Sequence, residues 1–351
     1  LAPDLVNDAV ADGKIDFVVM NRPLVADPHL PEKLRSGRID DVRPCNHCSN
    51  CFMSVINPDG FGFCRANPAH TRAFTNEMPE GYEPAKAQVS KRVMVVGGGP
   101  AGMEAAAVAA QRGHEVTLYD DKGALGGTLD FAALVKGPHE RIADFKEWQK
   151  RQLESGGVAV VTGTTVDASL VKSESPDVVV LATGASDPGV MLKPAGSTVV
   201  LSMEEAATSE VASPVCIVGE NLRALDLANY LLQQGKNVSI VHEGAKEDLA
   251  PEQAPWPRAM LISLLEGRGS QIHHGTSNVA VVDGGVSFTT SYGLECTLPA
   301  ACVVDCEPLV PNDALARELD GICDVIVVGD AETPSNIINA VATGNLKGRQ
   351  I

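Results

Sequence analysis

The sequence predicts an α/β protein in which one domain with a parallel sheet encloses a second domain of the same kind. Residues 91–120 read as strand, glycine turn, alanine-rich helix and strand, and residues 214–243 repeat that order. A late strand at residues 325–329, followed by a helix, resumes the first domain after the second is complete. Further strand-like runs lie at residues 158–161, 178–182, 279–282, 286–290 and 302–305.

Composition limits what the chain can do. The 351 residues are enough for two or three domains, and 44% of them are hydrophobic. A net charge of −17 argues against nucleic acid or an anionic membrane surface as a partner. No apolar run reaches the roughly 20 residues that span a bilayer, and the N-terminus lacks the pattern of a signal peptide. We therefore expect a cytoplasmic protein, with its oligomeric state open and a homo-oligomer included.

Four cysteines near the start of the chain have the spacing of a cluster-binding loop. Cys45, Cys48 and Cys51 are separated by two residues each, and Cys64 follows with twelve residues between. A cubane iron–sulfur cluster takes one thiolate on each corner iron. The sequence therefore predicts a 4Fe-4S cluster, which moves single electrons. The turn expected to bring the fourth thiolate back contains Pro58, Asp59, Gly60 and Gly62.

Zinc is the alternative occupant of these cysteines, although structural zinc sites usually pair two C-x2-C knuckles. His47 lies inside the run, and we interpret it as a neighbour that tunes the cluster by hydrogen bonding. The remaining cysteines show no disulfide framework and are interpreted as small buried residues. They are Cys216, Cys296, Cys302, Cys306 and Cys323.

The glycine turn of the first unit has the pattern of a dinucleotide site. Gly97, Gly99 and Gly102 follow a strand and open a helix, so they supply a tight turn, close approach to a pyrophosphate and close helix–strand packing. The helix N-terminus adds a positive dipole. Asp120, at the end of the next strand, is the acid expected to bind a ribose, with Asp121 as the alternative.

The corresponding turn of the second unit is altered. Gly219 is kept, but Asn221 stands at the second glycine position, where a side chain would crowd a pyrophosphate, and Glu220 adds negative charge. Glu243, at the end of the second strand, favours a free ribose 2′-hydroxyl and hence NAD over NADP. Binding of a nicotinamide nucleotide and retention of the fold for packing alone both remain open here.

Two later segments resemble the signatures of the two-dinucleotide flavoprotein reductases. Ala182-Thr183-Gly184 follows one buried strand, and Gly329-Asp330 follows another. The resemblance implies that the first turn lies near the flavin nucleotide and that Asp330 bonds the ribityl chain. It also implies that the helix from about Pro334 directs its N-terminus at the flavin ring, where its dipole stabilises negative charge.

The order of these parts resembles the C-terminal half of the iron–sulfur flavoproteins related to old yellow enzyme. That family includes 2,4-dienoyl-CoA reductase, enoate reductases and trimethylamine dehydrogenase, and the resemblance covers essentially the whole chain. It implies that residues 1–44 are the last unit of an FMN-binding (β/α)8 barrel, with a strand at residues 15–20 and Arg22 on the FMN phosphate. Asn21 departs from the family's usual glycine. The resemblance also places Gly127 and Thr183 at the outer nucleotide site.

The implied domains are residues 1–44 for the barrel remnant and 45–90 for the cluster loop and linker. An FAD- or ADP-binding domain then covers residues 91–200 and 313–351, with an inserted NAD(P)-like domain at residues 201–312. The chain opens at Leu1 in the middle of a pattern, so we expect a piece of a longer polypeptide.

Three functions are consistent with these parts. The first is the electron-transfer half of an NAD(P)H-dependent reductase with FAD, a 4Fe-4S cluster and FMN, acting on activated C=C bonds such as those of enoates or enoyl-CoA thioesters. The intact ATG and GD turns and the segment LGGTLDFAALVKGP favour it. The second is an amine dehydrogenase that passes electrons to an electron-transfer flavoprotein and holds ADP at the outer site. The cysteine spacing and the altered inner turn favour that reading, and the third is a non-catalytic electron-transfer module.

Overall fold

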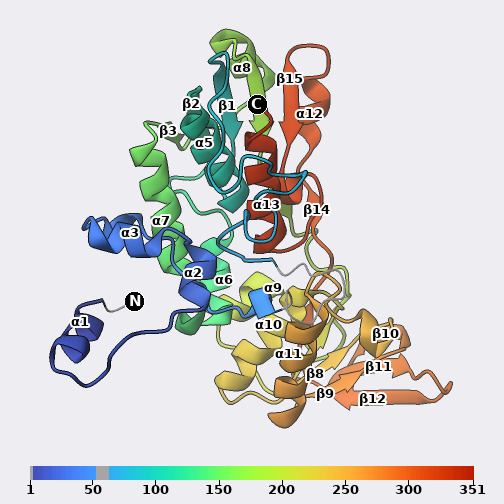
Figure 1. Ribbon diagram of the computed structural model, residues 1–351. Coiled ribbons are helices and arrows are strands. Elements are labelled where there is room, and N and C mark those ends of the chain that lie inside the picture. Colours follow the sequence, from blue (N-terminus) through green and yellow to red (C-terminus); the bar gives the residue numbers. More distant parts are fainter. Residues whose placement is uncertain (1–2, 53–62) are drawn as a thin grey trace.

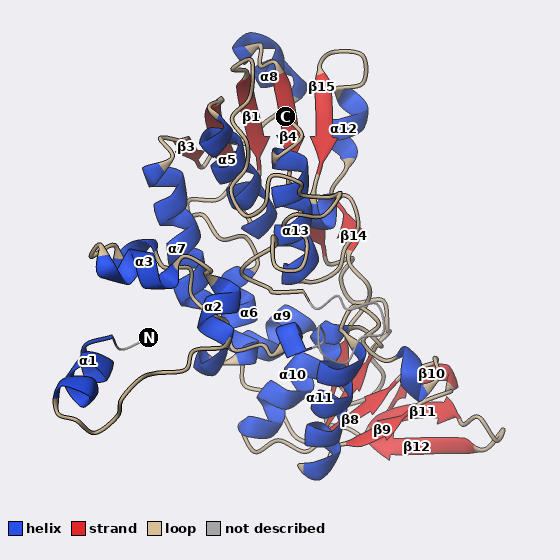
Figure 2. Ribbon diagram, in the orientation of Figure 1, coloured by secondary structure: helices blue, strands red, loops and turns tan. Residues whose placement is uncertain are grey.

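The protein has two α/β domains and an N-terminal arm, as Figure 1 shows. The computed structural model describes residues 3–52 and 63–351. The outer domain lies in the upper half of the view, the inner domain lies in the lower half, and the arm extends beside them. Figure 2 shows helices against the strands of both domains, the layering that parallel strands require because each crossover must cover a sheet face.

The outer domain is built on a five-stranded sheet of order β15-β4-β1-β2-β3, and all its strands are parallel. After Arg92, the central strand β1 is apolar and buried from Val93 to Val96, as a strand buried on both faces should be. Its Val95 pairs with Leu118 on one side and Val180 on the other. The strands are β1 (Arg92–Val96), β2 (Glu115–Asp120), β3 (Ala159–Thr162), β4 (Val178–Leu181) and β15 (Asp324–Val327).

Two helices far apart in sequence pack together on this sheet. Helix α5 (Pro100–Arg112) carries six alanines, and the last helix, α13 (Ile337–Gly348), approaches it closely through small residues. A Cβ added at Gly344 would lie 2.3 Å from the carbonyl oxygen of Ala101, so only glycine permits this packing. The remaining helices of the outer domain are α6 (Leu129–Lys136), α7 (Ile142–Ser155), α8 (Ala168–Glu174) and α12 (Ala314–Glu318).

The inner domain repeats the design with the strand order β6-β13-β7-β8-β9. These parallel strands are β6 (Val199–Ser202), β7 (Val215–Val218), β8 (Val238–Val241), β9 (Gln271–His273) and β13 (Cys302–Asp305). Its helices are α9 (Met203–Thr208), α10 (Leu222–Gln233) and α11 (Pro255–Gly267). A separate antiparallel sheet contains β10 (Ser277–Val282), β11 (Gly285–Thr289) and β12 (Glu295–Pro299).

A short antiparallel ribbon joins the two domains. Strand β5 (Ala185–Ser186) leaves the outer sheet, and β14 (Val310–Pro311) returns to it beside β5. The segments that lead into and out of the inner domain therefore lie side by side, so the inner domain can be inserted without separating the parts of the outer domain.

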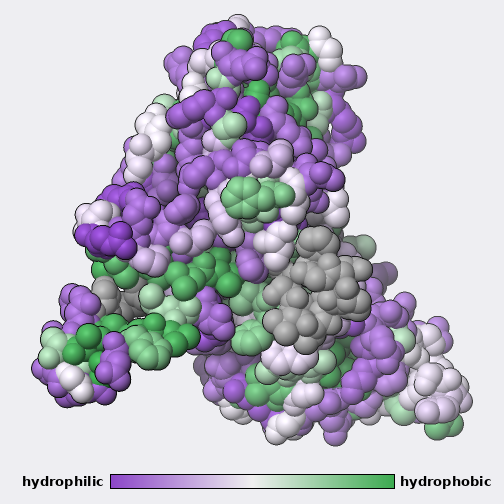
Figure 3. Space-filling view, viewed as in Figure 1, coloured by the Kyte–Doolittle hydropathy of each residue, from purple (hydrophilic) through white to green (hydrophobic). Residues whose placement is uncertain are grey.

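The N-terminal arm differs from the sequence-based expectation. The apolar run at residues 15–20 is irregular and solvent-facing, with Phe17 76% and Val19 82% exposed, so the predicted strand is wrong for this chain. A strand needs hydrogen-bonded neighbours, and the arm provides none for this run within the described residues. Apolar surface gathers along the arm in Figure 3. The arm contains α1 (Pro3–Ala11), α2 (Arg22–Ala26), α3 (Leu30–Arg35) and the 3-10 helices η1 (Ile39–Asp41) and η2 (Asn50–Phe52).

Three further 3-10 helices in the described residues are η3 (Pro138–Glu140), η4 (Lys246–Asp248) and η5 (Gly329–Ala331). Across residues 3–52 and 63–351, no helix combines the length and apolar character needed to cross a bilayer.

Candidate functional site

The four cysteines of the predicted cluster loop line one small cavity. Cys45 and Cys48 come from the irregular segment after η1, Cys51 comes from η2, and Cys64 comes from the start of the linker. Arg22, at the first position of α2, lines the same cavity. The turn residues Pro58, Asp59, Gly60 and Gly62 lie outside the described residues.

The thiols of this cavity are partly dehydrated, and they lie close enough to one another to interact electrostatically. Within the described part of the chain, no three His, Cys, Asp or Glu side chains converge closely enough to hold a single metal ion. A cubane does not need such convergence, because each thiolate binds its own iron. Burial, reinforced by Cys48, raises the pKa of Cys64 to about 12, and burial with Cys48 and Cys45 also raises the pKa of Cys51. A positively charged cluster iron would therefore be needed to hold them as thiolates.

A buried arginine sits at the edge of the cysteine cavity. Arg65 is 5% exposed and forms an ion pair with Glu140 of η3. Burial by itself lowers the pKa of Arg65, but Cys48 and Glu140 outweigh it and leave that pKa raised. His47 does not line the cavity, and its Nδ1 lies 3.1 Å from the carbonyl oxygen of His139.

The glycines of the outer turn form a closely packed cradle at the start of α5. Gly97 has φ +106°, and an added Cβ would lie 2.2 Å from the carbonyl oxygen of Ala182, in the ATG turn. An added Cβ on Gly102 would lie 1.9 Å from the carbonyl oxygen of Gly97. Gly99 is the N-cap of α5 and makes no side-chain cap hydrogen bond. The cradle therefore leaves the helix N-terminus open to an anion, the arrangement that binds a pyrophosphate.

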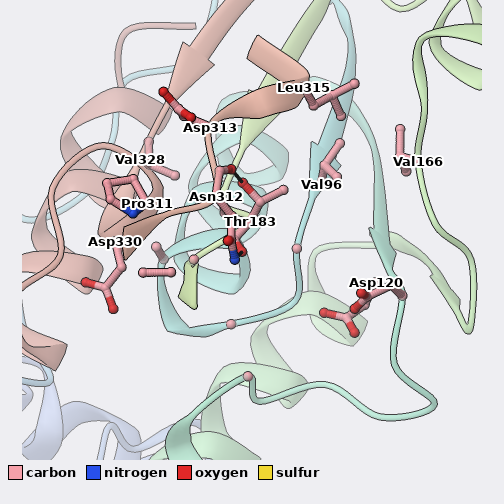
Figure 4. A pocket seen from close by; sticks show the side chains of 18 of the residues that line it. Val96, Asp120, Val166, Thr183, Pro311, Asn312, Asp313, Leu315, Val328 and Asp330 are labelled. Atoms are coloured by element: carbon pink, nitrogen blue, oxygen red, sulfur yellow. Dashed lines mark hydrogen bonds between the residues drawn. The ribbon is translucent and has the colours of Figure 1, made fainter. Parts of the chain in front are cut away.

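Asp120 is buried and organises this turn. Its carboxylate accepts hydrogen bonds from the amide nitrogens of Gly98 at 2.6 Å and Lys122 at 2.8 Å. It also lines a cavity of about 630 Å³ together with Gly97 and Gly99. In Figure 4 the side chains of Asp120 and Asp330 lie at opposite ends of that cavity. The adjacent Asp121 is exposed and lines the rim.

The residues placed at this site by family resemblance line the same cavity. Gly127 faces Gly99, and an added Cβ would lie 3.0 Å from the Cα of Gly99. Thr183 Oγ1 donates to the carbonyl oxygen of Asn312 at 2.6 Å, which joins the ATG turn to the returning chain. Asp330 Oδ1 accepts from the amide of Ser335 at 3.0 Å, and burial raises the pKa of its carboxyl.

Gly329 and the last helix complete this end of the site. The amide of Gly329 donates to Thr343 Oγ1 at 2.9 Å, and an added Cβ would meet Ala101 at 2.7 Å. Helix α13 begins at Ile337 rather than near Pro334, and its N-cap is Asn336.

The side chain of Asn221 fills the glycine turn of the inner domain. Asn221 caps α10, accepting from the amide of Ala224 at 3.0 Å and donating to the carbonyl oxygen of Cys306 at 2.8 Å. An added Cβ on Gly219 would lie 2.6 Å from that same oxygen. Glu243 follows β8 and is exposed. Gly219 and Glu243 thus occupy the expected positions of a dinucleotide turn, whereas Asn221 fills the space of the missing glycine.

A third cavity, of about 520 Å³, lies between the two domains. The outer domain contributes Gly127 and Asp330, and the inner domain contributes Asn221 and Glu252. Arg65 reaches it from the edge of the cysteine cavity. Sequence reasoning missed Asn312, Glu252 and Arg65, because each acts on a segment far away in sequence.

Comparison with known proteins identifies the family. Residues 91–333 match the pyridine nucleotide-disulphide oxidoreductase family. NADH oxidase of Thermoanaerobacter brockii is 33% identical over 353 residues, which cover 97% of this chain and 53% of that protein. Cinnamate reductase of Clostridium sporogenes is 32% identical over 352 residues, covering 97% of this chain and 50% of that protein. The chain thus spans about half the length of the curated relatives it matches.

Solved structures share the fold over nearly the whole chain. A 2-naphthoyl-CoA reductase matches with a TM-score of 0.83 and 29% identity, covering 99% of this chain and 52% of that one. Histamine dehydrogenase from Rhizobium sp. 4-9 matches with a TM-score of 0.83 and 25% identity, covering 99% of this chain and 57% of that one. The chain therefore belongs to the pyridine nucleotide-disulphide oxidoreductase family, and it corresponds to the C-terminal half of the iron–sulfur flavoproteins related to old yellow enzyme.

Proposed function

We propose that this chain is the electron-transfer half of an NAD(P)H-dependent oxidoreductase that reduces activated C=C bonds of the enoate or enoyl-CoA type. FAD would occupy the outer cavity, a 4Fe-4S cluster would occupy the cysteine cavity, and FMN would belong to the barrel half of such an enzyme. The relatives named cinnamate reductase and 2-naphthoyl-CoA reductase support this substrate class.

The observation that carries the proposal is that the three cavities share walls. Gly127 and Asp330 line both the outer cavity and the interdomain cavity. Arg65 lines both the interdomain cavity and the cysteine cavity. The interdomain cavity therefore adjoins the outer cavity on one side and the cysteine cavity on the other. A group that extends from the outer cavity into it would lie between a nicotinamide held by the inner domain and a cluster held by the cysteines.

The chain's own residues supply position and electrostatics. The open N-terminus of α5 suits a pyrophosphate, and the close approach of Gly99 and Gly127 leaves room for backbone contact with it. The N-terminus of α13 begins at the interdomain cavity, so its dipole favours negative charge there. A flavin held in this way exchanges two electrons with a nicotinamide and single electrons with a cluster.

One observation favours the second candidate, an amine dehydrogenase that delivers electrons to an electron-transfer flavoprotein. The side chain of Asn221 fills the inner glycine turn, which disfavours a nicotinamide nucleotide there. Relatives named dimethylamine dehydrogenase, from Hyphomicrobium, and histamine dehydrogenase, from Rhizobium sp. 4-9, each match 99% of this chain. In this alternative the outer cavity would hold ADP.

One anaerobic experiment separates the two candidates. The chain is reconstituted with iron and sulfide, the bound nucleotide is released and identified by mass, and NADH is added while the visible spectrum is recorded. Bound FAD that is bleached by NADH supports the reductase. Bound ADP, with no spectral response to NADH, refutes it and favours the amine dehydrogenase.

The cluster assignment has its own test. Cys51→Ala removes one of the four thiols that line the cavity, so we expect loss of iron and of iron–sulfur absorbance while the outer cavity keeps its nucleotide. Cys323→Ala is the matched control, because Cys323 lies outside that cavity. Unchanged iron content in Cys51→Ala would show that the thiol is not a ligand.

A further inference from the structure

The helices that follow the two glycine turns, α5 and α10, differ in whether side chains cap their N-termini. The first amides of a helix have no partner within the helix and attract anions. At α5 the N-cap is Gly99, and no side chain caps the helix. At α10 the amide of Leu222 donates to Glu252 Oε2 at 3.1 Å, and the amide of Ala224 donates to Asn221 Oδ1 at 3.0 Å. Two side chains of the inner domain thus occupy the amides that a pyrophosphate would use.

The segment that carries Glu252 is anchored to both domains. Leu249 and Ala250 are fully buried, and the amide of Ala250 donates to the carbonyl oxygen of Glu220 in the inner turn. The carbonyl oxygen of Glu252 accepts from Asn336 Nδ2, and Asn336 is the N-cap of α13 in the outer domain. Residue 252 therefore touches the start of α10 with its side chain and the start of α13 with its backbone.

The charges around this helix start repel a further anion. Burial, together with the nearby carboxylates of Glu220 and Asp226, raises the pKa of Glu252, although its hydrogen bond from Leu222 acts in the opposite direction. The neighbouring cation, Arg223, forms a 3.0 Å ion pair with Asp187. A dinucleotide phosphate arriving here would meet carboxylates, occupied amides and an arginine that is already paired.

We propose that Glu252 determines nucleotide affinity in the inner domain by occupying, with its own carboxylate, the pyrophosphate position at the start of α10. This inference rests on the proposed function, because it describes how a nicotinamide nucleotide gains the inner site. The nucleotide binds only as the Glu252 carboxylate leaves the amide of Leu222.

The test measures binding of NAD⁺ to the reconstituted chain by isothermal titration calorimetry. Glu252→Ala removes both the charge and the hydrogen bond, and we expect NAD⁺ to bind about tenfold more tightly than to the unaltered chain. Glu252→Gln removes the charge but keeps an acceptor, so its affinity should fall between the two. Glu204→Gln is the matched control, since Glu204 places the same charge on the same cavity from the first turn of α9.

The result that overturns the inference is an NAD⁺ affinity in Glu252→Ala and Glu252→Gln equal to or weaker than that of the unaltered chain. A gain of the same size in Glu204→Gln also overturns it, because the effect would then be one of general charge. If Glu252→Ala fails to fold, Glu252→Gln alone decides. Reduction of the flavin by NADH tests the proposed function separately. If NADH reduces the flavin in no variant, but NAD⁺ binds more tightly to Glu252→Ala, the proposed function is refuted and the role of Glu252 is supported.

Discussion

The ion pair between Lys136 and Asp226 should hold the two domains together, and its removal should cost far more than removal of a surface pair. Lys136 Nζ on α6 lies 2.6 Å from Asp226 Oδ2 on α10, with the two side chains only 9% and 12% exposed. Burial raises the pKa of Asp226 despite the lysine beside it, so the desolvation cost of this carboxylate is large. Lys136→Met leaves that carboxylate buried without its partner.

The magnitude follows from this burial. Losing one member of a buried pair typically costs about 3–5 kcal/mol, whereas replacing both members with apolar groups is often nearly neutral. We therefore expect Lys136→Met to lower the free energy of unfolding by about 3 kcal/mol. The double variant K136M/D226L should recover much of that loss. The deficit of Lys136→Met should shrink as the pH falls, because Asp226, with its raised pKa, takes up a proton and no longer places a charge in the interface.

Urea unfolding followed by tryptophan fluorescence measures the effect in each domain. Trp148 is buried in the outer domain and Trp256 is part of α11 in the inner domain, so Trp148→Phe and Trp256→Phe backgrounds separate the two signals. Lys150→Met is the control, because the pair of Lys150 with Glu147 is more exposed and should contribute about 0.5 kcal/mol or less. The ion pair does not have this role if Lys136→Met lowers the free energy of unfolding no more than Lys150→Met does. The same holds if the double variant loses the sum of the two single losses in unfolding free energy.

Two further predictions concern the outer domain. Gly102→Ala should impair nucleotide retention and lower the free energy of unfolding by about 1–3 kcal/mol, because its Cβ would meet the carbonyl oxygen of Gly97. Gly123→Ala is the control, because its Cβ would have open space, and it should retain the nucleotide normally. Equal nucleotide content in the two purified variants would contradict this. Burial alone would raise the pKa of Glu80, but backbone hydrogen bonding and Arg349 hold that pKa below its usual value. The charge of Glu80 therefore stabilises the fold above about pH 4.5, and this stabilisation is lost as the pH falls through the lowered pKa. Melting temperatures of Glu80→Gln and the unaltered chain should therefore differ at pH 7 and converge in acid, and a difference that persists in acid would count against the pairing.

The outer glycine turn could be predicted from sequence because its determinants are local. Gly97, Gly99 and Gly102 lie within one strand–turn–helix unit, and Asp120 follows at the end of the next strand. The nested fold class was predicted for the same reason and is confirmed by the family match and the two parallel sheets.

Other parts could not be read from the sequence, because they depend on contacts between distant segments. Glu252 meets Leu222 across 30 residues, and Arg65 meets Glu140 across 75. Neither pair leaves a local pattern. The apolar run at residues 15–20 has a strand's composition, but a strand forms only where neighbours pair with it, and within the described chain this run has none.

The ribbon formed by β5 and β14 has a consequence for the order in which the molecule can be assembled. Its two strands close a loop of about 120 residues, and bringing the ends of so long a flexible chain together would cost on the order of 4 kcal/mol in entropy. A folded inner domain removes most of that cost, since its own sheet already brings the two ends together. Folding of the outer domain should therefore follow that of the inner domain. Variants that unfold only the inner domain should weaken nucleotide binding in the outer cavity, although they change none of the residues that line it.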